Sequence, residues 1–354
     1  MAQRHITRRT FLKGMGGAAV GAVFLEQLAG RALAAKACYP SRTTVRWIVP
    51  YSPGGGYNVY SRMLEPFAEE ELGAEIVVEN HPGAGGAIGM TKTFKSRANG
   101  RTLGILNAGG MVMAGVAGEV DFTVDQYTIL GRLVDTRQVI FVGKPTYQRG
   151  IRTIEDVLKV KKPLIWGVTG PASNGFFGAA VLSHVLGIKR KFLSGYPGSA
   201  ETILGATKGE VDIIEFTFSS VTGAVEAGDV IPIALVGPKV PNHPIFKEKK
   251  IPTVMEIAKM VGANPDDALG AAQVTAAGRV LAGPPGIPPG LAKCLGDGLY
   301  RAMTRPGFRS IAKGARRPID PINADEARKA MKQASNAARK FKPVWKKAVK
   351  ELGV

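Results

Sequence analysis

Short apolar runs alternate with helical patterns along most of the chain, and the first two runs each end in a glycine loop. Residues 47–51 (WIVPY) lead into the first glycine loop, residues 52–56 (SPGGG), and residues 75–80 (EIVVEN) lead into the second, residues 81–86 (HPGAGG). A run of β-formers before each loop and a helical pattern after it predict consecutive strand–helix units. Further strands are predicted at residues 101–107, 138–143, 164–168, 189–195, 211–217 and 231–237.

The pattern is less regular in the last third of the chain. A helix is predicted over residues 254–262, the signal weakens through residue 277, and another apolar run begins at Val280. A helix over residues 290–303 and a long basic helix over residues 323–349, interrupted at Pro343, end the sequence. Strands that alternate with helices in this way are typical of a parallel α/β sheet.

The two glycine loops are the strongest candidates for a binding site. Glycine allows backbone conformations that a Cβ excludes, and a helix start presents free N–H groups together with the positive end of the helix dipole. Loops at the carboxyl ends of neighbouring parallel strands face one crevice. We therefore interpret the crevice as a cradle for a small anion, with tight turns that bind nothing as the alternative.

The first 37 residues have the pattern of a twin-arginine export signal. Arg8 and Arg9 precede Phe11-Leu12-Lys13, and a mildly apolar run that is too short for a bilayer is followed by small residues. This predicts export by the twin-arginine translocase and a periplasmic protein. An ordinary basic terminus is one alternative and lipid on Cys38 is another, disfavoured because Lys36 is unusual in a lipidation site.

Composition limits the remaining chemistry. The chain has 354 residues, a formal net charge of +19 and two cysteines, Cys38 and Cys294. This length suggests two domains, and two cysteines provide neither a disulfide framework nor a thiolate metal site, although one bridge between them is possible. His81, His184 and His243 have no partner at ligand spacing, and no nucleophile elbow or phosphate loop occurs. We expect no cofactor, no metal and no catalysis.

Seven segments, in order, resemble the periplasmic substrate-binding proteins of tripartite tricarboxylate transporters, the Bug receptor family. They are residues 48–56 with Arg62, residues 77–89, 99–103, 195–200, 209–212, 251–253 with Glu256, and 283–288. The resemblance implies a two-lobed α/β periplasmic binding protein fold (a Venus flytrap), each lobe a mainly parallel sheet flanked by helices. Lobe one would be residues 38–143 plus 278–354, and lobe two residues 144–277.

The resemblance also implies a function and a site. Such receptors bind a small organic carboxylate between the lobes and deliver it to the large and small membrane subunits of a permease, without a nucleic-acid partner. The family's contacts carry over, in lobe one, to Tyr51, Ser52, Pro53, Gly54, Gly55, Gly56, Asn58, Gly83, Ala84, Gly85 and Gly86. In lobe two they carry over to Thr169, Ser173, Asn174, Tyr196, Gly198 and Ser199.

Several of these residues have a structural alternative. Ser173 or Asn174 can act only as a helix N-cap, and Tyr196 can be a core aromatic residue. Asn58 stands where the family usually has Asp, which favours a ligand without an amine and predicts that Asn58→Asp weakens binding. The family usually has a histidine at the start of the helix after this turn, where this chain has Asn174 and Gly175 followed by Phe176 and Phe177. The two phenylalanines can line an apolar wall of the pocket or belong to the core. The competing functions are an exported α/β enzyme acting on an acidic or phosphorylated small molecule and an anion-binding protein without a permease.

Overall fold

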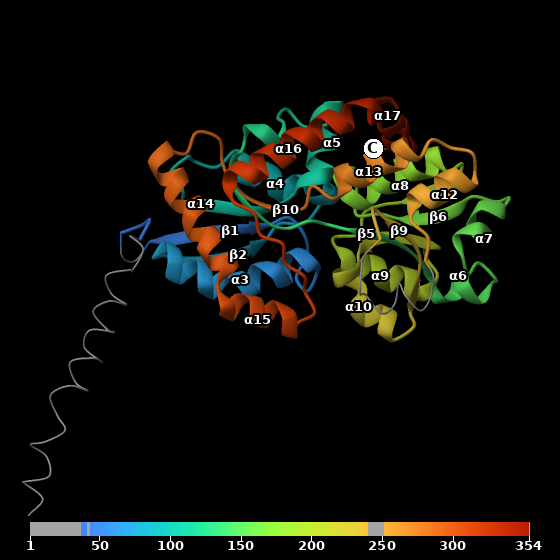
Figure 1. Ribbon diagram of the computed structural model, residues 1–354, viewed down its shortest axis with the longest axis horizontal. Helices are drawn as coiled ribbons and strands as arrows, with labels where there is room; N and C mark the ends of the chain where they lie inside the picture. Colours follow the sequence, from blue (N-terminus) through green and yellow to red (C-terminus); the bar gives the residue numbers. More distant parts are fainter. Residues whose placement is uncertain (1–36, 41–42, 240–250, 354) are drawn as a thin grey trace, which may run out of the picture. The chain divides into compact units, whose positions relative to one another are not determined.

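Two five-stranded sheets organise residues Cys38–Val354, which form one compact unit (Figure 1). The structure is a computed structural model that describes residues 37–40, 43–239 and 251–353. The first sheet has the order β2-β1-β3-β10-β4, with β1 (Thr44–Val49), β2 (Glu75–Asn80), β3 (Thr102–Asn107), β4 (Thr128–Val134) and β10 (Arg279–Gly283). The second has the order β7-β6-β8-β5-β9, with β5 (Gln138–Gly143), β6 (Leu164–Gly167), β7 (Arg190–Leu193), β8 (Ile213–Thr217) and β9 (Val230–Val236).

The predicted α/β architecture with two mainly parallel sheets is confirmed, and each sheet also contains one strand that runs antiparallel to the other four. In the first sheet β1 pairs in parallel with β2 and β3, whereas β10 is antiparallel to both of its neighbours. The second sheet repeats this arrangement with β5 as the antiparallel strand. The antiparallel strand of each sheet is the one by which the chain changes sheets. β5 enters the second sheet directly from β4, and β10 returns to the first sheet from the segment that follows β9.

The helices flank these sheets. Those from the segments of the first sheet are α3 (Gly56–Leu72), α4 (Ala87–Phe94), α5 (Ala108–Ala117), α14 (Pro289–Thr304), α15 (Pro306–Gly314) and α16 (Ala324–Ala338). The second sheet is accompanied by α6 (Lys144–Gln148), α7 (Ile154–Lys159), α8 (Asn174–Val185), α9 (Ser199–Lys208), α10 (Phe218–Glu226), α12 (Val254–Met260), α13 (Pro265–Thr275) and α17 (Lys342–Glu351). Short 3-10 turns are η1 (Ala84–Gly86), η2 (Val124–Gln126) and η3 (Arg339–Phe341).

One continuous apolar core connects the two sheets on one side. Helices α5, α8, α13, α16 and α17 gather on that side (Figure 1) and pack against one another in a chain of contacts. The core that they cover includes Leu106 of β3 and Ile140 of β5. A second core lies between α3, α14 and the first sheet, and a third between α9, α10 and the second sheet. In the part of the chain that the structure describes, no helix is long and apolar enough to cross a membrane.

The structure revises three details of the sequence interpretation. The strand at residues 138–143, assigned above to lobe one, pairs within the second sheet between β8 and β9. Helix α17, also assigned to lobe one, packs on both α5 and α8 and so contacts helices that accompany each of the two sheets. The long basic helix is divided at η3, and Pro343 lies in the first turn of α17, where proline is tolerated because that N–H has no intrahelical partner.

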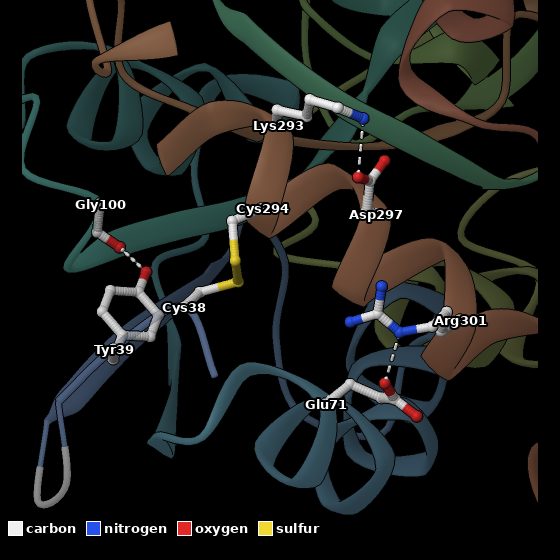
Figure 2. The surroundings of a disulfide bond; sticks show 8 residues. All are labelled: Cys38, Tyr39, Glu71, Gly100, Lys293, Cys294, Asp297 and Arg301. Carbon is white, nitrogen blue, oxygen red and sulfur yellow. Dashed lines mark hydrogen bonds and ion pairs between the residues drawn. A yellow bond between two sulfur atoms is a disulfide. The ribbon is translucent and has the colours of Figure 1, made fainter. Parts of the chain in front are cut away.

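A disulfide between Cys38 and Cys294 attaches the chain before β1 to helix α14 (Figure 2). The two Cα atoms are 5.6 Å apart and the residues are 256 positions apart in sequence. Next to it, the Tyr39 hydroxyl donates to the Gly100 carbonyl, and Cys38 N donates to Leu72 O. A bridge of this kind adds about 2–4 kcal/mol to the free energy of unfolding. The Cys38 sulfur that a lipid would need is therefore in the bridge. The rest of the predicted export signal, residues 1–36, lies outside the described residues.

Candidate functional site

A cavity of about 50 Å3 lies between the carboxyl edge of the first sheet and the second sheet. This is room for about three to five water molecules or a comparably small organic group. Its walls come from the first glycine loop and from β8, β10 and the turn before α8. The lining residues are Tyr51, Gly55, Gly56, Tyr57, Thr136, Gln138, Gly167, Val168, Thr169, Ser173, Asn174, Gly175, Ser199, Glu215, Phe216, Thr217, Ser220 and Arg279.

Arg279, the first residue of β10, supplies a positive charge to this cavity. The residue is 2% exposed, and Nη2 donates to Thr217 Oγ1 (3.2 Å) and Ser220 Oγ (3.3 Å), while Nε and Nη1 have no partner among the described residues. The guanidinium also lies over the rings of Tyr57 and Tyr60. Among the described residues no carboxylate forms an ion pair with it. A buried cation with unused donors is a strong attraction for an anion, since such groups are normally paired.

The start of α3 adds backbone donors beside Arg279. The first N–H groups of a helix have no intrahelical partner, and no side chain caps this helix, whose N-cap is Gly55. A Cβ added at Gly56 would lie 2.8 Å from Arg279 Nη2 and 2.3 Å from Ser220 Oγ. Glycine at this position therefore lets the guanidinium approach the helix start, where both favour negative charge.

Glu215 of β8 is the one acidic residue in the lining. It is 1% exposed, and neither carboxyl oxygen has a hydrogen-bond partner among the described residues. Its burial raises the pKa of this carboxyl well above its usual range. Burial likewise raises the pKa of Tyr57 to about 12, partly offset by the Arg279 charge. The cavity therefore combines one cation with a carboxyl group whose burial favours its protonated form.

The second glycine loop lies beside the cavity, not in its wall. Gly85 N donates to Thr169 O (3.1 Å), and Tyr51 Oη donates to Gly85 O (2.8 Å). A Cβ on Gly85 would meet Gly170 O at 2.6 Å and Ser173 N at 2.7 Å. The loop thus packs backbone to backbone against the turn before α8 and connects the two sheets.

The turn before α8 contributes side chains that are already hydrogen bonded. Ser173 is the N-cap: its Oγ accepts from Phe176 N and donates to Gly170 O. Asn174 Nδ2 donates to Thr136 Oγ1 and Thr275 O, both at 3.2 Å, while its Oδ1 has no partner. Asn174 therefore has one buried acceptor without a partner among the described residues, whereas Ser173 has the capping role that the sequence left open.

The other predicted site residues lie outside the lining. Ser52 Oγ donates to Glu201 Oε2 (2.9 Å) and Ser52 N donates to Pro197 O (3.2 Å), so this residue contacts α9 and the segment before it. Asn58 Oδ1 accepts from Gly54 N (3.3 Å) and Nδ2 donates to Asn80 Oδ1 (3.0 Å). Tyr196 packs on α9 and donates to Glu210. Of the predicted residues, the cavity brings together Tyr51, Gly55, Gly56, Thr169, Ser173, Asn174 and Ser199, and leaves out Ser52, Pro53, Gly54, Asn58, Gly83, Ala84, Gly85, Gly86, Tyr196 and Gly198.

The sequence interpretation missed the basic and the acidic residue of the cavity, Arg279 and Glu215. Glu215 interrupts an apolar run that becomes a buried strand, and Arg279 directly precedes such a run, so a charged residue type in or next to a buried strand is the signal that could have identified them. Phe176 and Phe177, in contrast, are fully buried in the core against Trp345 and Phe341, so they do not form a pocket wall. His184 is exposed, and among the described residues no cluster of His, Cys, Asp and Glu could hold a metal ion.

Comparison with known proteins identifies the family. The model of the tripartite tricarboxylate transporter family receptor matches residues 60–350. The chain belongs to this receptor family. A UPF0065 protein of Bordetella pertussis is 23% identical to this receptor over 291 residues, which cover 81% of this chain and 84% of the relative.

Solved structures show the same fold as this receptor. The periplasmic binding protein BugD has a TM-score of 0.70 and 20% sequence identity, with 86% of this chain and 98% of BugD covered. MatC from Rhodopseudomonas palustris with bound malate has a TM-score of 0.68 and 18% identity, with 88% of this chain and 100% of MatC covered.

Proposed function

We propose that this receptor binds a small organic carboxylate in the cavity between its two sheets and delivers it to the large and small membrane subunits of a permease. The observation that carries the proposal is the buried, unpaired Arg279 beside the uncapped start of α3. A carboxylate there would satisfy Nε and Nη1 of Arg279 and would also accept from backbone N–H groups. The malate bound by MatC supports this ligand class.

A receptor fits the lining better than an exported enzyme does. The lining has hydroxyl, amide and tyrosine groups but no histidine, cysteine or lysine that would activate a nucleophile. We therefore expect that the ligand is bound without turnover. The proposed site consists of Arg279 and the predicted residues that line the cavity, which are Tyr51, Gly55, Gly56, Thr169, Ser173, Asn174 and Ser199.

Two features support export to the periplasm. The Cys38–Cys294 disulfide is of a kind that persists in oxidising compartments, and the pattern around Arg8 and Arg9 is that of a twin-arginine signal. We propose that residues 1–37 are the signal and that the exported chain begins close to Cys38, whose sulfur the bridge occupies instead of a lipid.

Removing the Arg279 charge tests the proposal. Charge-assisted hydrogen bonds contribute about 1.5–3 kcal/mol, so we expect Arg279→Gln to weaken carboxylate binding about 10- to 100-fold. The measurement is calorimetry on a panel of small carboxylates, with Arg62→Gln, an exposed arginine of α3, as the matched control. The free energy of unfolding should not fall in the Gln variant, because the charge it removes is buried and unpaired. Unchanged affinity in Arg279→Gln would reject Arg279 as the anchor. If the wild-type protein binds none of the carboxylates in the panel, the proposed function is wrong.

A further inference from the structure

Glu215 has a place in the cavity that the carboxylate anchor does not explain. Its carboxyl is buried, its two oxygens have no partner among the described residues, and it lines the same cavity as Arg279. Buried polar groups nearly always have hydrogen-bond partners, so each exception requires an explanation. A ligand group that completes the site is such an explanation.

Helix α8 has the residue that accommodates this acid. A Cβ added at Gly178 would lie 2.0 Å from Glu215 Oε1 and 2.4 Å from Oε2. Glycine inside a helix costs about 1 kcal/mol relative to alanine. The space for the Glu215 carboxyl is therefore maintained at the expense of helix stability, as expected of a side chain with a role in the site.

The position of Glu215 along β8 sets its distance from the anchor. Side chains two residues apart on a strand lie on the same face, about 7 Å from each other. Thr217, which accepts a hydrogen bond from Arg279, is two residues after Glu215. A ligand whose carboxylate meets Arg279 can thus reach Glu215 with a polar group a few bonds away.

The protonation state of Glu215 depends on its burial and on the charged groups of the elements packed around it. The strands beside it, β5 and β6, carry no titratable side chain, and the histidine of α8, His184, is exposed. Helices α9 and α10 carry Glu201, Lys208 and Glu226 but pack with Ile214 in the third core, on the opposite face of β8. Among the described residues of the lining, Arg279 is the only basic one. The loss of solvation on burial therefore raises the pKa of Glu215.

We propose that Glu215 stays protonated and donates a hydrogen bond to an uncharged polar end of the ligand, whose carboxylate Arg279 binds. The inference rests on the proposed function and specifies its substrate class: a monocarboxylate with a hydroxyl or carbonyl group at the far end. A second carboxylate would find no second cation in the lining. An ammonium group would require Glu215 to ionise in a buried site, which is costly.

Calorimetry with matched ligands tests this inference. The probes are straight-chain carboxylates of three to six carbons that differ only in the far end: hydroxyl, keto, second carboxylate or ammonium. We expect hydroxy or keto acids to bind about tenfold or more tightly than the diacid and the amino acid of equal length, because a site built for one hydrogen bond leaves buried groups unpaired with the wrong partner. Their affinity should fall as the pH rises through the raised pKa of Glu215.

Glu215→Gln separates the two protonation states. Glutamine is neutral and donates at any pH, so the variant should keep its affinity for the preferred acid within about threefold and lose the pH dependence. Glu119→Gln makes the same change on an exposed residue after α5 and should alter neither property. If the amino acid binds best and Glu215→Gln abolishes its binding, Glu215 acts as an anion and the inference is wrong. A preference for the diacid overturns it too, while the proposed function stands. If no carboxylate binds either form, the function fails and the inference with it.

Unfolding of the free protein gives a readout that needs no ligand. Above the usual glutamate pKa the unfolded chain releases a proton that the folded chain retains at Glu215, so stability falls as the pH rises towards the raised folded pKa. Glu215→Gln removes this dependence, and its melting temperature should exceed that of the wild type increasingly from pH 5 to pH 8. Parallel curves for the two proteins would show that Glu215 is ionised when folded and would overturn the inference.

Discussion

The two glycine loops have similar sequences and follow neighbouring strands, yet the structure uses them differently. β1 and β2 pair in register from Thr44 with Glu75 to Val49 with Asn80, so both loops leave the same edge of the first sheet. The first glycine loop leads into the uncapped α3 and, through Gly55 and Gly56, lines the cavity. The second donates Gly85 N to Thr169 O and is absent from the lining.

Backbone conformation explains this difference. In the second loop Gly83, Ala84, Gly85 and Gly86 all have positive φ, whereas in the first only Gly54 does. Consecutive positive φ angles fold the second loop tightly enough for its backbone to meet the turn before α8. The first loop takes ordinary angles at Gly55 and Gly56, where the missing Cβ leaves room for Arg279 and Ser220. One loop therefore joins the sheets and the other builds the site.

The largest effect is expected from a Cβ in the second loop. Gly85→Ala combines an unfavourable φ of 70° with a Cβ 2.6–2.8 Å from backbone atoms of Gly170, Ala172 and Ser173. We expect a loss of about 2–4 kcal/mol in the free energy of unfolding, measured by urea denaturation. Gly118→Ala is the control, because Gly118 has a φ of +83° but no atom within 4 Å. Equal losses in the two variants would show that the second loop does not pack against the turn.

A Cβ in the first loop should instead affect binding. In Gly56→Ala the new atom meets the ends of two flexible side chains, Ser220 and Arg279, which can move at little cost to folding. The guanidinium then leaves its position, so we expect carboxylate affinity to fall about tenfold or more, with stability within about 1 kcal/mol of the wild type. Calorimetry and urea denaturation measure the two effects. Gly223→Ala, a glycine of α10 with no atom within 4 Å, should change neither, and retained affinity in Gly56→Ala would exclude the first loop from the site.

The smallest effect is expected at Asn58. Its side chain lies outside the cavity lining and bonds to Gly54 N of the first glycine loop and to Asn80 at the end of β2. A negative charge there is therefore separated from the ligand and screened by solvent. We expect Asn58→Asp to change carboxylate affinity by less than about threefold, with Asn336→Asp on the exposed face of α16 as the control. The sequence alone favoured a strong weakening. A tenfold loss by calorimetry would restore that view and place Asn58 at the ligand.

Much of the fold was predictable from local patterns. Local patterns gave β2 and β5 with the bounds that the structure shows. β5 is buried along its whole length and is therefore a short, continuous apolar segment, whereas the edge strand β2 alternates exposed and buried residues at its start. Strand β4 was not predicted, and α13 lies where the helical signal was weak. In α13 most residues are small and the helix is buried on several sides, so no clear amphipathic period marks it.

The site was only partly predictable. Glycine runs and the hydroxyl and amide groups at a helix start indicated where an anion would bind, because these features act through the local backbone. The sequence determined by itself the alternating α/β elements, the two glycine loops and the family. Only the tertiary structure decided that Arg279 and Glu215 share one cavity, that the second glycine loop joins the sheets, and that Cys38 bonds to Cys294. Those pairings join residues from about 60 to 256 positions apart, and contacts over such separations depend on how the two sheets pack, which no local pattern encodes.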